Sequence, residues 1–228
     1  MTGSEVLLLS GGPHPFAETT PILTRVIEDE GGRVTVVERP EAAADLLSAG
    51  TADLLVLNTL RWRMSEDRYA DQRGEHAYAS SPTARAAIGD WILGGGRVLA
   101  CHAAVVCFDD WPEWGSLLGA RWHWDRSSHP PLGEVAVHVA APDHPLVCGL
   151  ADAVIVDECY GFLDHTIAID GLLTGQHGGA VHPLLWEHRP GAGHVVVSLL
   201  GHGPDSFRHP LHDAILRRAL RHLVGAVT

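Results

Sequence analysis

Residues 94–104 have the sequence GGGRVLACHAA, and this short stretch indicates the fold class of the chain. The glycines are typical of the end of a helix, and Arg97–Cys101 is a mostly apolar run of strand length. The run stops abruptly at His102, and two small alanines follow it. A buried strand, a sharp turn through a reactive residue and a following helix describe an elbow, in which the strained turn lifts one side chain above the sheet.

Two registers fit this elbow. If Cys101 is at the tip, its thiol faces a helix N-terminus, which lowers the pKa of a thiol and favours nucleophilic chemistry. If His102 is at the tip, the elbow presents a base or a metal ligand, and Cys101 is a buried strand residue. Free cysteines commonly pack in the core, so the sequence leaves both registers open.

Strands and helices alternate before the elbow. The patterns predict strands over residues 5–9, 33–38, 53–58 and 97–101, and helices over residues 19–30, 40–48 and 81–93. This alternation is typical of an α/β protein with three layers, in which a parallel sheet carries helices on both faces. A flavodoxin-like strand order is the favoured topology.

The second half of the chain has a different pattern. Strand-like segments follow one another with turns between them, so we expect antiparallel additions to the sheet, and an amphipathic helix closes the chain. The predicted strands cover residues 134–139, 154–156, 172–174, 184–187 and 194–200, and the helix covers residues 210–224. No linker or repeat interrupts the sequence, which predicts a single domain over residues 1–228.

Composition narrows the class of protein. The chain of 228 residues is 46% hydrophobic, which is typical of a globular protein. Its net charge of −12 argues against nucleic acid as a partner. No apolar run approaches a membrane span or a signal peptide, so we expect a cytoplasmic protein with reduced cysteines. The oligomeric state stays open, and a homo-oligomer is compatible with the sequence.

Histidines and other polar residues follow the predicted strands. In an open α/β sheet, ligands bind outside the carboxyl ends of the strands. His14 follows the first strand, Asn58 ends the third with Trp62 just beyond, His102 follows the fourth, and His202 follows the last. We therefore expect one shared site, with the loop over residues 60–80 at its border and Arg61, Arg63, Tyr69 and Tyr78 as further contacts.

A pair of acids follows another predicted strand. Asp157 and Glu158 are neighbours and point to opposite sides, so at most one faces the site, and Tyr160 shares the side of Glu158. We predict that Glu158 joins His14, His102 and His202. Ligands that converge on one point favour a divalent metal such as zinc, whereas direct hydrogen bonds favour acid–base chemistry. The sequence does not decide between them.

Other motifs carry less information. Trp111, Trp114, Trp122 and Trp124 could stack on a sugar, but packing is the favoured interpretation for most of them. His144 lies in a predicted turn and is interpreted as structural. The zinc motif HExxH is absent, and Pro13 removes a backbone donor from the only glycine pair that could hold a phosphate after the first strand.

Several of these segments together resemble the ThuA-like family, which takes its name from a trehalose-utilisation protein. The segments are GGGRVLACHAA, DDWPEWGSLLGARW, APDHPLVCGL, VDECYGF and GHVVVSLLGH. The resemblance covers nearly the whole chain and implies a class I glutamine amidotransferase-like fold. It places the family's elbow histidine on His102, its acidic–aromatic motif on Asp157, Glu158 and Tyr160, and its terminal Gly-His on Gly201 and His202. Cys101 departs from the pattern, because the family usually has an aliphatic residue there.

The resemblance also implies a role in carbohydrate metabolism, on trehalose, keto-sugars or glycosides. A glutaminase is disfavoured, because Gly203 and Pro204 follow His202 where a His-x-Glu motif is expected. The leading hypothesis is a sugar-modifying enzyme with His102 and His202 as acid–base groups or metal ligands, Glu158 as their partner and Tyr160 as an orienting hydroxyl. His14, Asn58, Trp62 and Asp157 are the candidate substrate contacts. The alternatives are a cysteine hydrolase or glyoxalase-like enzyme of the DJ-1/PfpI type that uses Cys101, and a sugar-binding module without catalysis.

Overall fold

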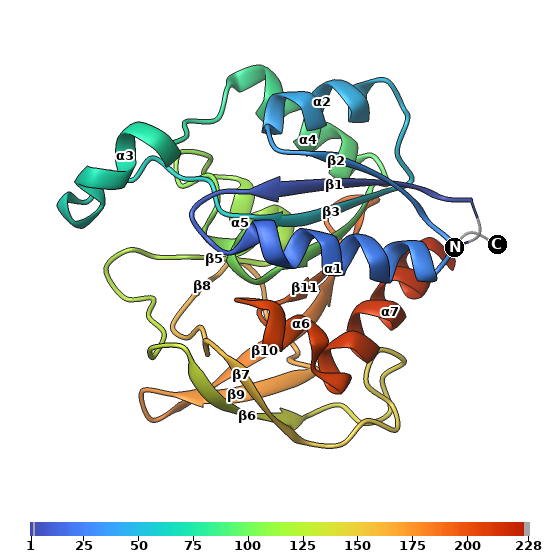
Figure 1. The fold of residues 1–228 in the computed structure, drawn as a ribbon, viewed down its shortest axis with the longest axis vertical. Coiled ribbons are helices and arrows are strands. Elements are labelled where there is room, and N and C mark those ends of the chain that lie inside the picture. Colours follow the sequence, from blue (N-terminus) through green and yellow to red (C-terminus); the bar gives the residue numbers. More distant parts are fainter. Residues whose placement is uncertain (2, 226–228) are drawn as a thin grey trace.

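The computed structural model describes residues 1 and 3–225 and has the three-layer α/β architecture (Figure 1). Within these residues a nine-stranded sheet has the order β2-β1-β3-β4-β11-β10-β9-β6-β7. A small second sheet pairs β5 (Ala120–Arg121) with β8 (Asp164–His165). The predicted fold class, a parallel core with antiparallel additions, is confirmed.

The parallel part of the sheet forms the flavodoxin-like half. Its strands are β1 (Glu5–Gly11), β2 (Arg33–Val37), β3 (Leu54–Thr59), β4 (Arg97–Cys101) and β11 (His194–Ser198). All neighbouring pairs among them are parallel, so their carboxyl ends meet at one edge. Strands β3, β4 and β11 are almost wholly buried, as their continuous apolar sequences predict.

Helices cover both faces of this half. Helices α1, α6 and α7 contact one another on one side, and α2 packs on α4 on the other. Their bounds are α1 Phe16–Asp29, α2 Pro40–Ser48, α4 Pro82–Leu93, α6 Pro204–Arg208 and α7 Pro210–Gly225. Proline opens α2, α4, α6 and α7, where its missing N–H costs no hydrogen bond. The short helices α5 (Trp114–Leu118) and α6 have too few turns to show a period, and the sequence did not predict them.

The second half of the sheet is antiparallel, and its strand directions bring the acids to the same edge as the elbow. Its strands are β6 (Gly133–Val139), β7 (Ala153–Asp157), β9 (Leu173–His177) and β10 (Ala180–His188). The four successive pairs from β11 to β7 are antiparallel, so β7 runs in the direction of the parallel strands. The carboxyl end of β7, with Asp157, therefore lies at the carboxyl edge of the sheet.

Residues 60–80 are more ordered than a long loop. They contain a 3₁₀ turn η1 (Asp67–Tyr69) and a helix α3 (Ala70–His76), which projects from the body of the molecule (Figure 1). No residue of α3 is buried, which explains why no apolar period marks the helix in the sequence.

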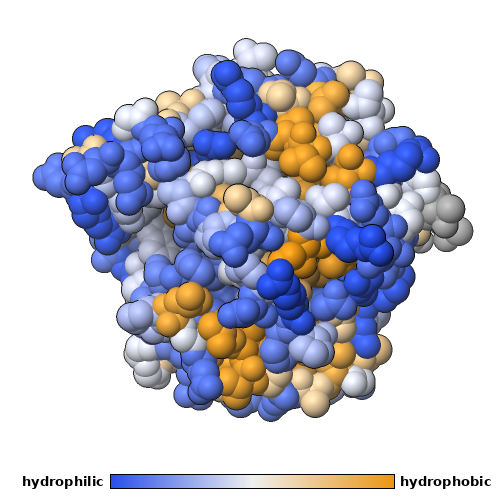
Figure 2. All heavy atoms as spheres, viewed as in Figure 1, coloured by the Kyte–Doolittle hydropathy of each residue, from blue (hydrophilic) through white to orange (hydrophobic). Residues whose placement is uncertain are grey.

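The surface is predominantly hydrophilic on the face shown in Figure 2, with separate hydrophobic patches. One patch lies over the lower part of the molecule, where β6 and β7 run, and Val154 and Val156 of β7 are exposed. No helix within the described residues is both long and apolar enough to cross a membrane.

Candidate functional site

The site is built on the elbow after β4, and His102 occupies its tip. His102 is a non-glycine residue with a φ of 45°, which is the strained left-handed conformation that an elbow requires. The 3₁₀ turn η2 (His102–Val106) follows it, rather than the α-helix that the sequence predicts. Ala103 and Ala104 are small enough to be buried directly behind the turn.

The His102 ring is held in one orientation. Its Nδ1 lies 2.8 Å from the carbonyl oxygen of Leu199, just beyond β11, and its Nε2 lies 3.1 Å from the hydroxyl of Tyr160. A carbonyl oxygen only accepts hydrogen bonds, so Nδ1 carries a proton, and the lone pair of the uncharged form of the ring is on Nε2. The Tyr160 hydroxyl donates to this lone pair. Burial raises the pKa of Tyr160 well above its ordinary value, which keeps the hydroxyl protonated.

Glu158 is the centre of the cluster. Its Oε2 lies 3.5 Å from Nε2 of His102 and 3.1 Å from Nδ1 of His202, and its Oε1 lies 3.3 Å from Nδ1 of His129. Burial acts to raise the pKa of Glu158, but His102 and His202 outweigh it and hold that pKa well below its ordinary value. The carboxylate in turn raises the pKa of His202. An ionised acid thus lies between imidazoles that can give and take protons.

Asp157 has a different role from the one that the sequence suggested. Its carboxylate is fully buried and accepts backbone hydrogen bonds from Gly201 (2.8 Å), His202 (3.3 Å) and Glu158 (2.8 Å). These contacts fasten the turn after β11 to the end of β7. Asp157 is therefore a positioning residue and not a substrate contact, although its Oδ1 also lies 3.8 Å from Nδ1 of His102.

His14 completes the group from the turn after β1. Its ring centroid lies 5.4 Å from that of His102 and 4.8 Å from that of His202. Burial, together with the two neighbouring imidazoles, lowers the pKa of His14 to about 3, so the ring is neutral near pH 7. Its Nδ1 is buried and has no hydrogen-bond partner among the described residues.

The three histidines could hold a metal ion. One ring nitrogen from each of His14, His102 and His202 lies within 4.8 Å of the others, and Glu158 contacts two of the rings. Imidazoles together with a carboxylate are a donor set that suits zinc. The structure therefore brings together all four residues of the predicted cluster, from four separate strand ends.

A cleft with aromatic walls adjoins the cluster. It has a volume of about 160 Å³, and its lining residues are Pro13, His14, Leu60, Trp62, Tyr69, Gln72, Val106, Trp122, Trp124, His129 and Tyr160. Trp62 stacks on Trp124 with ring centroids 6.0 Å apart, and Tyr69 meets Trp62 edge-on at 5.1 Å. The segment over residues 60–80 thus borders the cleft, as the sequence analysis predicts.

Other predicted contacts lie elsewhere. Asn58 is buried below the cleft, where its amide donates to Ser10 and Thr19, so its assignment as a substrate contact is wrong. Tyr78 donates to Glu41 on the far side of the segment. Arg61 donates to the backbone at Glu38, and Arg63 pairs with Asp109. These partners occupy most of the polar groups that the sequence assigned to a ligand, although Nε of Arg61 is buried without a hydrogen-bond partner among the described residues.

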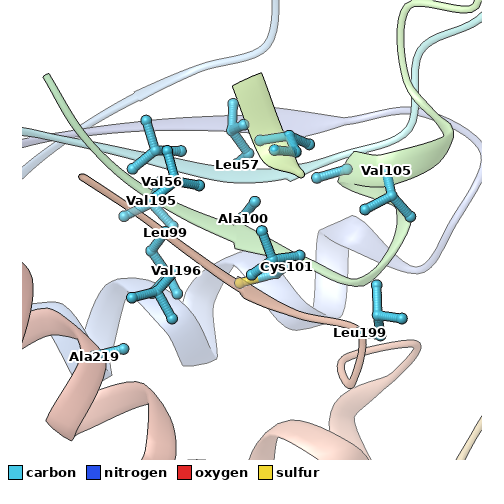
Figure 3. Packing of buried hydrophobic residues seen from close by; sticks show 14 of the residues in the cluster. Val56, Leu57, Leu99, Ala100, Cys101, Val105, Val195, Val196, Leu199 and Ala219 are labelled. Atoms are coloured by element: carbon cyan, nitrogen blue, oxygen red, sulfur yellow. The ribbon is translucent and has the colours of Figure 1, made fainter. Parts of the chain in front are cut away.

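Cys101 does not present a nucleophile. Its side chain lies in the core beneath the elbow, among apolar residues of β3, β4 and β11 (Figure 3). Burial raises the pKa of its thiol to about 12, so the thiolate is disfavoured at neutral pH. The register with Cys101 at the tip is therefore wrong, and a cysteine-dependent enzyme of the DJ-1/PfpI type has no support from this geometry.

Sequence reasoning missed His129, and it favoured packing for most of the four tryptophans between residues 111 and 124. The isolated bridge between Ser128 and Gly161 brings His129 beside Tyr160, with ring centroids 5.1 Å apart. His129 precedes two prolines in a polar turn, and no local signal marks such a pairing. Trp111 and Trp114 pack in the core as expected, whereas Trp122 and Trp124 line the cleft.

Solved structures with the same fold include proteins of very different length. A ThuA-like protein from Parabacteroides merdae ATCC 43184 superposes with a TM-score of 0.78 at 17% identity, over 98% of this chain and 90% of that one. A cytoplasmic protein from Salmonella typhimurium LT2 has a TM-score of 0.67 at 11% identity, over 96% and 99% of the two chains. The β-galactosidase from Rahnella sp. R3 has a TM-score of 0.62 at 14% identity, and the match covers 97% of this chain but 31% of the enzyme.

Sequence comparison is more specific about the family than the structural matches are. No curated protein sequence matches the chain. The family model described as trehalose utilisation matches residues 5–223, which include the elbow, the acidic–aromatic motif and the terminal Gly-His. Since the match spans nearly the whole sequence, this chain belongs to the ThuA family.

Proposed function

We propose that this protein is an enzyme that uses acid–base catalysis on a small, sugar-derived substrate. The observation that carries the proposal is the ionised Glu158 among His102, His202 and His129, at distances of 3.1–3.5 Å, beside a cleft lined by Trp62, Trp122 and Trp124. The family description, trehalose utilisation, and the likeness to part of a β-galactosidase support a carbohydrate as the substrate class.

The cleft fits a small ligand with polar edges. Its volume of about 160 Å³ is below the roughly 300–1,000 Å³ of pockets that enclose drug-sized molecules, which favours a single sugar unit over an oligosaccharide. Indole rings provide flat apolar faces for the C–H side of a sugar ring. The hydroxyl or carbonyl groups of such a ligand would then meet the imidazoles.

The proton chemistry follows from the hydrogen bonds. His102, with Nδ1 held by Leu199, has its lone pair on Nε2 and acts as the base. His202, whose pKa Glu158 raises, is the ring that we assign as the acid. Tyr160 orients the base by donating to Nε2. Such a pair suits proton transfer next to the carbonyl group of a keto-sugar, the substrate type that we favour. A zinc ion bound by His14, His102 and His202 would be an alternative to this proton chemistry, because coordination needs neutral imidazoles and uses their lone pairs.

The proposal is tested with keto-sugars and keto-glycosides in D₂O. We expect deuterium incorporation or product formation with the wild type, as measured by NMR, and its loss in His102→Gln and Tyr160→Phe. His188→Gln is the matched control, because His188 lies on β10, outside the cluster. Binding of the same sugars without exchange or turnover would contradict the proposal and indicate a binding module. We also propose a cytoplasmic location, on the printed description of the Salmonella relative.

A further inference from the structure

A second cluster of histidines and a glutamate lies at the opposite edge of the sheet. Oε2 of Glu187 lies 2.8 Å from Nε2 of His222 and 3.1 Å from Nε2 of His194, and Oε1 lies 3.6 Å from Nε2 of His144. His194 is the first residue of β11, so the cluster is at the amino edge, a full strand length from the elbow. We call it the amino-edge cluster, and the group around Glu158 the carboxyl-edge cluster.

Strand register explains how two of these residues meet. Glu187 of β10 pairs with Val196 of β11, so their side chains point to the same face of the sheet. His194 is two residues before Val196 and shares that face, because side chains alternate along a strand. The acid and the imidazole are therefore diagonal neighbours on adjacent antiparallel strands.

Helix α7 supplies the third residue. Val196 and Ala219 belong to the same core cluster, and Figure 3 shows both on the side of the sheet that α7 covers. His222 follows Ala219 by three positions and so lies on the same face of the helix. The ring centroids of His222 and His194 are 5.1 Å apart.

His144 approaches the same carboxylate from the turn after β6. Its ring centroid is 6.2 Å from that of His222, and the backbone N–H groups of Val147 and Cys148 donate to its carbonyl oxygen. The sequence analysis interprets His144 as structural, and these contacts place it in the cluster. The hairpin of β10 and β11, helix α7 and the turn after β6 thus each bring a side chain to the Glu187 carboxylate.

The dimensions match a tetrahedral metal centre. Zinc bonds of about 2.0–2.1 Å to nitrogen and oxygen place neighbouring ligand atoms roughly 3.3 Å apart. Oε2 of Glu187 lies 2.8 Å from Nε2 of His222 and 3.1 Å from Nε2 of His194, whereas the 3.6 Å to Nε2 of His144 is measured from Oε1. The ligand atoms of Glu187, His194 and His222 all lie within 4.8 Å of one another.

We propose that Glu187, His194 and His222 bind one zinc ion, with His144 as the fourth ligand. Nitrogen donors favour zinc over magnesium and calcium, which prefer sites made of oxygen atoms. Four protein ligands are typical of a structural zinc site, in which no position is left for a substrate. Such an ion would fasten β10, β11, α7 and the turn after β6 to one another.

The test uses untagged protein in a His102→Ala background, which disables the carboxyl-edge cluster. After treatment with a chelator, zinc is added back, and bound zinc and the melting temperature are measured. We expect one zinc per chain and a rise in melting temperature of roughly 5–10 °C at zinc 100-fold above its Kd. Cobalt added in place of zinc should give the visible absorption of a tetrahedral ion.

Two variants assign the site. In the same background, His222→Gln and Glu187→Gln should weaken zinc binding by roughly 100-fold or more. His188→Gln is the control, because its side chain contacts Ser116 and lies outside the cluster. Equal zinc content in His222→Gln and the control, or no zinc in the His102→Ala protein itself, would overturn the proposal. This readout is independent of catalysis, so it is separate from the test of the proposed function.

Discussion

The two clusters contain the same residue types, yet the sheet builds them for different tasks. At the carboxyl edge, Nδ1 of His102 is held by the Leu199 carbonyl, the backbone is strained at His102, and a cleft with aromatic walls adjoins the rings. At the amino edge, Nε2 of His194 and Nε2 of His222 contact Glu187, and the groups join strands to a helix. A fixed tautomer beside a cleft suits proton transfer, whereas converging rings that connect separate elements suit a bound ion.

Removal of the elbow base should have the largest effect. We expect His102→Gln to lower turnover of a keto-sugar by roughly 10²–10⁴-fold, the usual contribution of a general base. His194→Gln at the other edge should change turnover by less than about twofold. Steady-state kinetics of the two purified variants measures both effects. A similar loss in both would show that the two clusters do not have separate tasks.

A substitution in the wall of the cleft should have a smaller effect on turnover than removal of the base. Trp62 is buried against Trp124 and Tyr69, and it reaches the cleft from a segment that holds none of the proton-transfer groups. We expect Trp62→Ala to raise KM by about 10-fold or more while kcat falls less, because a stacking contact contributes to substrate and transition state alike. Trp62→Phe should recover most of the affinity. A fall in kcat with unchanged KM would instead give Trp62 a role in the chemistry.

The sequence was most informative about the carboxyl-edge cluster, because topology decides its location. Parallel strands deliver their ends to one edge, so His14, His102 and His202 could be grouped without any coordinates. To place Glu158 in the cluster, one must know the direction of β7. That direction depends on four successive antiparallel pairings that no local pattern specifies. The strong apolar runs predict the core strands. Helices α5 and α6 were missed because each has only five residues, too few to show a helical period.

The amino-edge cluster was not predicted. Glu187 and His222 lie in an ordinary strand and an ordinary amphipathic helix, and their meeting depends on the register of β10 with β11 and on the packing of α7. His144 was singled out only as a turn residue. Asn58 was misassigned for a related reason: a strand end identifies the correct edge, but it does not tell whether the side chain points to the cleft or to Ser10 and Thr19 below it.

Titration should distinguish the two edges. Glu158 raises the pKa of His202 above the ordinary 6.5, whereas burial lowers that of His194 below it. The His202–Glu158 contact therefore contributes full stability below about pH 6.5, and this is lost as the pH rises through the folded-state pKa. The neutral His194 contributes in the opposite sense, with stability present above about pH 6.5 and lost as the pH falls.

NMR titration of the imidazole protons of metal-free protein measures both values. Glu158→Gln should lower the pKa of His202, because its charged partner is removed. The same variant should leave His194 unchanged, since Glu187 is that residue's neighbour. If His202 titrates at or below 6.5 in the wild type, the assignment of His202 as the acid is wrong.

The smallest effect on turnover should come from Cys101, although it is adjacent to the elbow histidine in the sequence. Its thiol is enclosed by the core with a pKa raised to about 12 by burial, whereas Cys148 is exposed. We expect a thiol reagent to label the native protein at Cys148 and to leave turnover unchanged. Cys101→Ala should keep turnover within about twofold. It should lower the melting temperature by a few degrees, because it removes the buried sulfur atom and its packing contacts. Cys148→Ala is the control for labelling. Inactivation by the reagent that persists in Cys148→Ala and disappears in Cys101→Ala would contradict this prediction. It would place Cys101 at the tip of the elbow and add a nucleophile to the groups at the carboxyl edge.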